Sequence, residues 1–197
     1  VTTLLAISLG AILTNNFIFS QFLGICPFLG VSKKLDSAVG MSLAVTFVMV
    51  MATAATWPLY MGILAPNGLE YLQTIVFILV IAILVQLLEN FLKKFIPALY
   101  KSLGVYLPLI TTNCTILGVT ILNLDNGYSF PESIVCAAGA GIGFLVAMVL
   151  FSGVRRKVEQ AIVPECFKGL PITLVAAAMT SLSFMGFGGI VEAIFGV

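Results

Sequence analysis

The sequence has no histidine and few charged residues: nine lysines and arginines and eight aspartates and glutamates make up 9% of its 197 residues. A soluble domain usually carries about 25% charged residues, so the composition excludes a soluble globular protein and a disordered chain. The net charge of +1 leaves no basic excess for a phosphate backbone, which excludes a nucleic-acid-binding protein. Because 60% of the residues are hydrophobic and the mean hydropathy is +1.17, we predict a polytopic membrane protein.

The charged residues divide the chain into six long uncharged windows. Each window approaches or exceeds the roughly 20 residues that a helix needs to cross a hydrocarbon core of about 30 Å. The windows are residues 1–32, 37–68, 71–88, 102–124, 133–154 and 169–191. We therefore predict an all-α polytopic membrane protein with six transmembrane helices in a single membrane domain, residues 1–197. The longest polar connection, residues 155–168, is too short for a nucleotide-binding domain, so we expect no complete active site in this chain.

All basic residues fall in three connections between the windows. They are Lys33 and Lys34 in the first, Lys93, Lys94 and Lys101 in the third, and Arg155, Arg156, Lys157 and Lys168 in the fifth. By the positive-inside rule, these connections are cytoplasmic. Both termini are then expected on the extracytoplasmic side.

The pattern Cys-x-x-Leu-Gly-Val occurs twice, in the first and in the fourth window. Its copies cover residues 26–31 and 114–119 and open corresponding three-helix halves of the chain. Because three is odd, the two halves insert into the membrane in opposite directions. The pattern therefore predicts two inverted repeats, about residues 1–92 and 93–197.

Helix-breaking residues accompany both copies of the pattern. Gly24, Pro27 and Gly30 lie at the first copy, and Pro108 and Gly118 lie at the second. Proline removes a backbone donor and glycine weakens a helix, so the first and fourth transmembrane helices are expected to be broken. Paired broken helices predict a functional site, with the two pattern cysteines close together near the middle of the membrane.

The pattern cysteines, Cys26 and Cys114, are the candidate site residues. A buried cysteine often serves packing alone, but the matched positions beside helix breaks favour a functional pair. A structural zinc site needs four protein ligands and a [2Fe-2S] cluster needs four thiolates, so two cysteines are half a site and a second chain would complete it. Cys136 and Cys166 lie outside the pattern. We interpret Cys136 as a packing residue and Cys166 as a reduced cytoplasmic thiol.

Glycines recur within the fifth window. Gly139, Gly141 and Gly143 lie inside an apolar span with no preceding strand, which argues against a dinucleotide-binding loop. Gly139 and Gly143 instead predict a surface for close helix packing.

Both cysteine segments resemble motifs of one membrane protein family. Residues 22–35, FLGICPFLGVSKKL, are similar to the first-span motif of the A-type members of Rnf complexes, and residues 107–119, LPLITTNCTILGV, are similar to the fourth-span motif. The resemblance covers about residues 15–189. The D and E subunits of the sodium-pumping NADH:quinone reductase belong to the same family. The double asparagine before Phe17 and Pro27 after Cys26 look more like the Rnf type.

The resemblance implies a function in electron transport. In this family, paralogous A-type and E-type subunits of opposite orientation each give two cysteines to one intramembrane [2Fe-2S] cluster, so Cys26 and Cys114 would be metal ligands. The complex moves electrons between ferredoxin and NAD and couples this to Na⁺ or H⁺ translocation. The chain would then be a subunit of a translocase-type oxidoreductase in a bacterial or archaeal cytoplasmic membrane, with an E-type subunit, other Rnf subunits and lipid as partners.

Hydrogen bonds to sulfur tune the potential of such a cluster. The backbone amides freed around Gly24, Gly30, Thr112 and Gly118 are the expected donors.

The alternatives are a D- or E-type subunit of the quinone reductase and a stand-alone secondary transporter built from inverted repeats. A transporter would bind its substrate at polar residues around the two breaks, and its cysteines would be dispensable. Those residues are Asn15, Asn16, Thr111, Thr112 and Asn113. No acidic residue lies at the centre of a window, which argues mildly against an ion-coupled carrier. A thiol–disulfide oxidoreductase would more often show closely spaced cysteines.

Overall fold

A computed structural model describes residues 2–14, 16–32, 35–95, 107–161 and 164–195. Every regular element in these ranges is a helix, and no strand occurs among them. In chain order the elements are α1 (Thr2–Leu9), the π-helical η1 (Gly10–Thr14), α2 (Ile25–Val31), α3 (Leu35–Leu59), η2 (Tyr60–Leu64), α4 (Ala65–Asn67), η3 (Glu70–Leu72), α5 (Gln73–Phe95), α7 (Leu107–Thr111), α8 (Cys114–Asp125), α9 (Phe130–Gln160), η4 (Glu165–Phe167) and α10 (Leu170–Phe195). The predicted all-α class is thus confirmed for this part of the chain.

Several helices are long and apolar enough to cross a membrane. By length and composition these are the three segments Leu35–Asn67, Gln73–Phe91 and Phe130–Gln160. Two shorter apolar helices, Leu109–Asp125 and Leu170–Gly186, complete the set within the described residues. The fold is therefore that of a multi-pass membrane protein, while the count of six spans stays a prediction.

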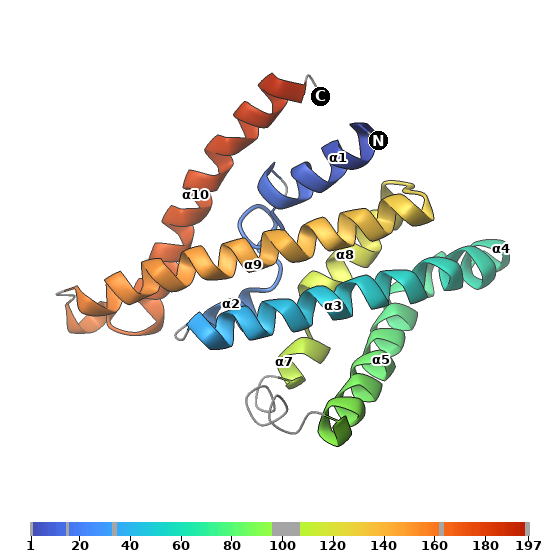
Figure 1. The fold of residues 1–197 in the computed structure, drawn as a ribbon, viewed down its shortest axis with the longest axis horizontal. Coiled ribbons are helices and arrows are strands. Elements are labelled where there is room, and N and C mark those ends of the chain that lie inside the picture. Colours follow the sequence, from blue (N-terminus) through green and yellow to red (C-terminus); the bar gives the residue numbers. More distant parts are fainter. Residues whose placement is uncertain (1, 15, 33–34, 96–106, 162–163, 196–197) are drawn as a thin grey trace.

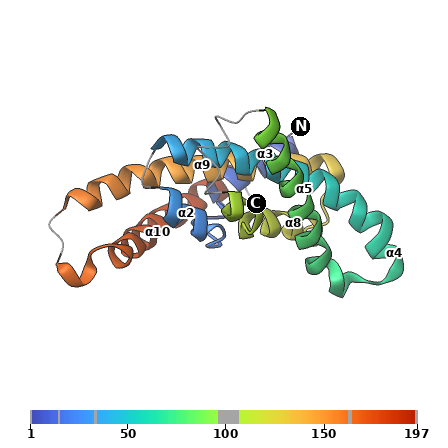
Figure 2. The same ribbon diagram turned by 90° about the horizontal axis from the view of Figure 1, so that it is seen from below.

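Helices α3 and α9 form the centre of the molecule, where they lie side by side and antiparallel (Figure 1). Figure 2 shows the same pair from below. Both helices carry fully buried apolar side chains, among them Met41 and Met49 of α3 and Phe144 of α9. A Cβ atom added at Gly141 would lie 2.7 Å from Thr46 Oγ1, so only glycine permits the two helices to approach this closely.

A second close contact joins α9 to the start of the chain. A Cβ atom at Gly139 would lie 3.1 Å from the carbonyl oxygen of Ser8, and one at Gly143 would lie 3.0 Å from that of Ala11. Because these two glycines have no side chain, α1 and η1 can pack closely against the surface of α9. The predicted close packing surface is confirmed.

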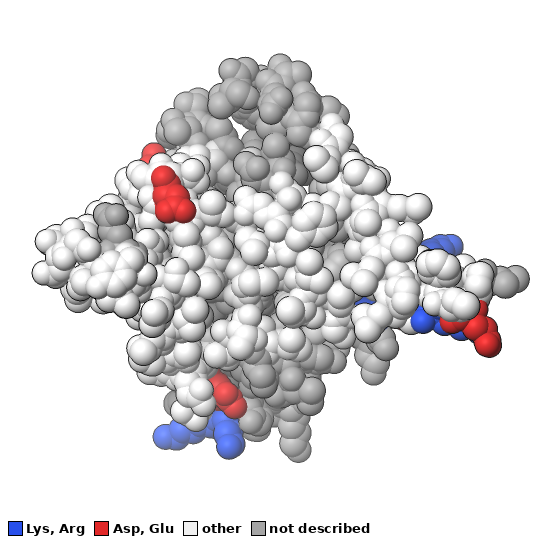
Figure 3. All heavy atoms as spheres, turned by 180° about the vertical axis from the view of Figure 1, so that it is seen from behind, with Lys and Arg blue, Asp and Glu red and all other residues white. Residues whose placement is uncertain are grey.

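The outer helices turn apolar side chains outward. On α5, buried Phe77 and Val85 alternate with exposed Ile75, Ile83 and Leu87, so both faces of the helix are hydrophobic. Figure 3 shows a broad surface without charge, with the charged residues gathered at the margins. A helix that is hydrophobic all round suits a lipid environment.

The described basic residues gather at helix ends. Lys93 and Lys94 lie in the last turn of α5, and Lys168 precedes α10. Lys33, Lys34 and Lys101 lie outside the described residues.

Candidate functional site

The first apolar segment is interrupted beside its cysteine. Helix η1 ends at Thr14, residues 16–24 form turns, and α2 begins at Ile25. Asn16 is 1% exposed and fixes the start of this 16–24 loop. Its amide nitrogen donates to the carbonyl of Gly143 at 2.9 Å, and its amide oxygen accepts from the backbone N–H of Ile18 at 3.2 Å. The side-chain amide thus bonds the broken end of the helix to α9.

Helix α10 holds the middle of the 16–24 loop. The hydroxyl of Ser181 donates to the carbonyl of Phe19. The Phe19 ring packs on Phe184 with ring centroids 4.5 Å apart and meets the edge of Phe28 at 5.8 Å. The first half of the loop is therefore buried against α2, α9 and α10, whereas Ser20, Gln21 and Phe22 are exposed.

The end of the 16–24 loop reaches the second cysteine. The backbone N–H of Gly24 donates to Cys114 Sγ at 2.9 Å. Gly24 has a φ of +84°, and a Cβ atom there would collide with Thr115 Oγ1. Only glycine fits this conformation and this space. Since Gly24 is two residues from Cys26, this bond brings the two cysteine motifs together.

Helix α8 begins with Cys114, whose sulfur accepts the hydrogen bond from Gly24. Asn113 precedes it in an extended conformation and caps the helix by accepting from the N–H of Thr115 at 3.1 Å. One turn further on, a Cβ atom at Gly118 would collide with Leu23 Cδ1. The glycines of both motifs thus let the 16–24 loop and α8 come into contact.

The four cysteines are free and differ in their surroundings. Cys26 is exposed and Cys114 is partly buried, both at the meeting of the two motifs. Cys136 is buried within α9, as expected of a packing residue, and Cys166 is exposed in η4, as expected of a loop thiol.

The donor set fits half of an iron–sulfur site. Among the described residues, no group of three or more histidine, cysteine or acidic side chains could hold a metal ion. A [2Fe-2S] cluster takes four thiolates, and the two motifs offer two thiols at neighbouring segments. The Gly24 N–H is one of the expected donors, and it does bond to a motif sulfur. Two thiols would be half of such a ligand set, so a second chain would have to supply the other half.

The polar residues that a transporter would use to bind its substrate differ from one another in burial and in hydrogen bonding. Asn16 uses both ends of its amide within the fold, and Asn113 uses its oxygen as a helix cap. Asn113 is 4% exposed, and its amide nitrogen has no hydrogen-bond partner. Thr111 is partly buried, Thr112 is exposed, and Asn15 lies outside the described residues. The side chains of Asn16 and Asn113 thus make hydrogen bonds that stabilise the fold.

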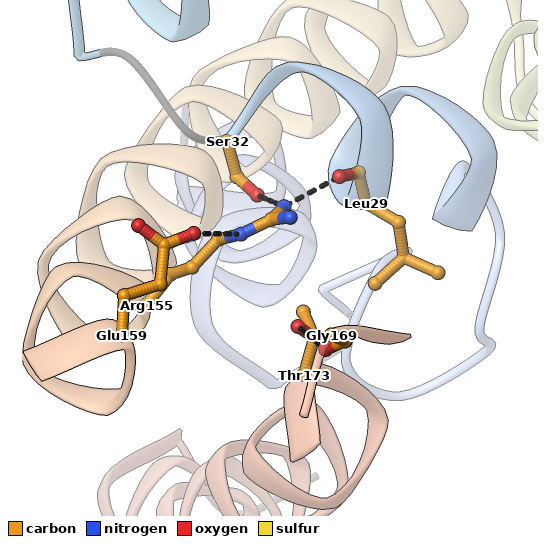
Figure 4. Close-up of polar contacts among 6 residues, drawn as sticks. All are labelled: Leu29, Ser32, Arg155, Glu159, Gly169 and Thr173. Carbon is orange, nitrogen blue, oxygen red and sulfur yellow. Dashed lines mark hydrogen bonds and ion pairs between the residues drawn. The ribbon is translucent and has the colours of Figure 1, made fainter. Parts of the chain in front are cut away.

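Arg155 departs from its predicted place at the start of a polar loop. Helix α9 continues to Gln160, and Arg155 lies within it with only 8% of its surface exposed. Its guanidinium donates to the carbonyl of Leu29 and to Ser32 Oγ, both at the end of α2 (Figure 4). A hydropathy pattern places the end of a span at a charged residue. No pattern in the sequence therefore indicates that Arg155 is buried and hydrogen-bonded.

Comparison with known proteins shows which family the sequence resembles. The family model described as "Rnf-Nqr subunit, membrane protein" matches residues 4–191. A protein of Syntrophotalea carbinolica, named as the A component of an ion-translocating oxidoreductase complex, is 54% identical over 188 residues, covering 95% of this chain and 97% of the relative. A protein of Acetobacterium woodii, named as the A component of a Na(+)-translocating ferredoxin:NAD(+) oxidoreductase complex, is 54% identical over 187 residues, with the same coverage.

A further relative, from Aliivibrio salmonicida, is also named as the A component of an ion-translocating oxidoreductase complex. It is 49% identical over 191 residues, covering 97% of this chain and 99% of the relative. These names agree with the resemblance that the two cysteine motifs carry. The chain belongs to the Rnf-Nqr family of membrane subunits.

Proposed function

We propose that this chain is a membrane subunit of an Rnf-type ion-translocating ferredoxin:NAD oxidoreductase, in which Cys26 and Cys114 supply two of the four ligands of one intramembrane [2Fe-2S] cluster. The observation that carries the proposal is the hydrogen bond from the Gly24 N–H to Cys114 Sγ, because it joins the two motifs. The relatives named as A components of such complexes favour the Rnf type over the quinone reductase.

The bound cluster would supply one-electron transfer across the middle of the membrane. The chain's own residues hold and tune the ligands. Gly24 donates a hydrogen bond to the Cys114 sulfur, and Asn113 fixes the first turn of the helix that begins with Cys114. A hydrogen bond to sulfur stabilises the more negative, reduced state of a cluster, so Gly24 raises its reduction potential.

The other ligands would come from a paralogous E-type subunit of opposite orientation. Cys26 is exposed, so its sulfur is accessible to a second chain. Within this chain we propose six spans in two inverted repeats, with broken first and fourth spans and extracytoplasmic termini. The antiparallel pairing of α3 and α9, which are the corresponding second helices of the two halves, supports this arrangement.

Metal analysis of the purified complex tests the ligand assignment. Cys26→Ser and Cys114→Ser should each remove the iron and labile sulfide of one [2Fe-2S] cluster, because serine is a poor substitute for a thiolate ligand. Cys136→Ser and Cys166→Ser are the matched controls and should leave the iron content unchanged. Full iron content in both motif variants, with all subunits present, would show that the motif cysteines are packing residues.

A further inference from the structure

Arg155 is a buried cation bonded to the short helix that carries Cys26. Its Nη1 atom donates to Ser32 Oγ at 2.8 Å and to the Leu29 carbonyl oxygen (Figure 4). Ser32 is fully buried, with 0% exposure. The remaining charged contact, Nε to Glu159 Oε1 at 3.4 Å, lies within α9 and involves a carboxylate that is 57% exposed. The buried contacts of the guanidinium are therefore directed at α2.

Helix α2 depends on such external contacts. It has only 7 residues, Ile25–Val31, and a helix this short is not stable by itself in water. Its last carbonyl groups have no partners within the helix, and a cation at this end also interacts favourably with the helix dipole. The Arg155 guanidinium meets both needs, and α2 in turn gives the buried charge its acceptors.

A second contact joins the same two helices one turn earlier in α9. The Phe28 ring stacks on the Phe151 ring with centroids 4.1 Å apart and an interplanar angle of 27°. Phe28 and Phe151 are both almost fully buried. The aromatic stack holds the middle of α2 and Arg155 holds its end, so α2 is fixed in position and in rotation against α9.

The position of Cys26 follows from that of α2. Cys26 is the second residue of the helix, and its side chain is exposed. We propose that Arg155 is a positioning residue that holds α2, and with it the Cys26 sulfur, in the geometry that a metal ligand requires. This inference rests on the proposed function, because it assigns to Arg155 the support of a proposed ligand.

The test compares Arg155→Met, Arg155→Lys and the control Arg156→Met in the purified complex. Arg156 is exposed and adjacent, so its replacement removes the same charge without touching α2. Loss of a bond to a metal ligand typically weakens metal affinity by about 10- to 100-fold. Arg155 acts through α2 and not on the sulfur itself, so R155M should lose cluster iron to a chelator faster than wild type by at most about that factor. Its cluster EPR signal should also broaden or shift. R155K keeps one donor group and should lie between R155M and wild type, while R156M should match wild type.

Wild-type iron loss and a wild-type EPR signal in R155M would overturn the assignment. Should R155M not accumulate, R155K and Ser32→Ala carry the test, and wild-type behaviour in both would overturn it equally. A wild-type complex whose cluster content does not depend on Cys26 would instead refute the proposed function. The two failures are therefore distinguishable.

Discussion

The backbone N–H of Gly24 and the sulfur of Cys114 form the contact at which the two cysteine motifs meet. Two features of this contact require glycine: the φ of +84° and the Thr115 hydroxyl in the space of an added Cβ atom. A side chain at residue 24 would force the backbone or Thr115 to shift, and the N–H that is directed at the sulfur belongs to this same residue. The residue thus links a backbone conformation to the electronic surroundings of a proposed ligand.

Gly24→Ala should lower the midpoint potential of the cluster, because it weakens a hydrogen bond that favours the reduced state. The left-handed conformation costs an L-residue about 1–2 kcal/mol, so the variant should also unfold at a lower temperature. Gly30→Ala is the matched control, since an added Cβ atom there meets its nearest neighbour, Leu109 Cδ1, only at 4.0 Å. An EPR-monitored redox titration measures the effect. Equal potentials in wild type and G24A would refute the tuning role of this amide.

The sequence marks Cys26 and Cys114 as candidate ligands because a repeated pattern contains them. It marks Gly24 only as one of several possible donors, since the choice depends on which amide faces a sulfur 90 residues away. It gives the wrong place for Arg155, because a charge at the edge of an apolar window usually ends the span. Here the acceptors Leu29 and Ser32 come from another helix and make burial possible.

Helix α9 supports both ends of the interrupted first segment. Near the middle of α9, the absence of a side chain at Gly143 lets η1 pack closely, and the Gly143 carbonyl accepts a hydrogen bond from the Asn16 amide. Two to three turns later, Phe151 and Arg155 hold α2. One continuous helix therefore supplies contacts on both sides of the interruption in the first segment, as expected of irregular backbone buried in a membrane protein.

Gly143→Leu should destabilise the protein by about 1–3 kcal/mol, because the side chain would be forced into the backbone of η1. The added Cβ atom alone would lie 3.0 Å from the Ala11 carbonyl oxygen and 3.2 Å from Ile12 Cα. Gly153→Leu changes the same residue type in the same helix, where an added Cβ atom meets nothing within 4 Å. Thermal unfolding in detergent should give a lower Tm for G143L only. A Tm for G143L equal to that of G153L would contradict the packing described for α9.

The glycines and prolines predicted that both segments are broken, but not where. Only Gly24 lies at a break, whereas Pro27 and Gly30 lie within α2, Pro108 within α7 and Gly118 within α8. The first break takes up residues 16–24, whereas the second leaves only Thr112 and Asn113 outside the helices. The short break is possible because Asn113 caps α8 at once by accepting from the N–H of Thr115. The long one needs anchors on α8, α9 and α10, which a sequence pattern does not reveal.

Two pairs of helix contacts among the described residues correspond between the two proposed halves. Helix α5 packs on α3 as α10 packs on α9, and α7 packs on α5 as η1 packs on α10. These two pairs of contacts correspond between the halves, as expected for two copies of one three-helix unit, whereas the contacts of α8 with α3 and of α1 with α9 have no counterpart of similar extent in the part of the chain that the structure describes. This correspondence supports the inverted repeats that the repeated cysteine pattern and the odd number of spans per half predict.

The proposed orientation can be tested from both sides of the membrane. Cys166 is exposed and lies in a connection expected in the cytoplasm. An impermeant maleimide should therefore label Cys166 in inside-out vesicles and not in intact spheroplasts. A cysteine placed at exposed Asn126, in a Cys166→Ser background, should show the opposite pattern. Labelling of both positions from the same side would exclude the proposed topology.

In the proposed function, Cys26 and Cys114 ligate one cluster within the membrane. Low-temperature EPR of the anaerobically purified, dithionite-reduced complex tests it most directly. One [2Fe-2S] signal should disappear in Cys26→Ser and in Cys114→Ser and should persist in Cys136→Ser and Cys166→Ser. Every variant should keep its full set of subunits. An unchanged signal in either motif variant would contradict the assignment of that cysteine.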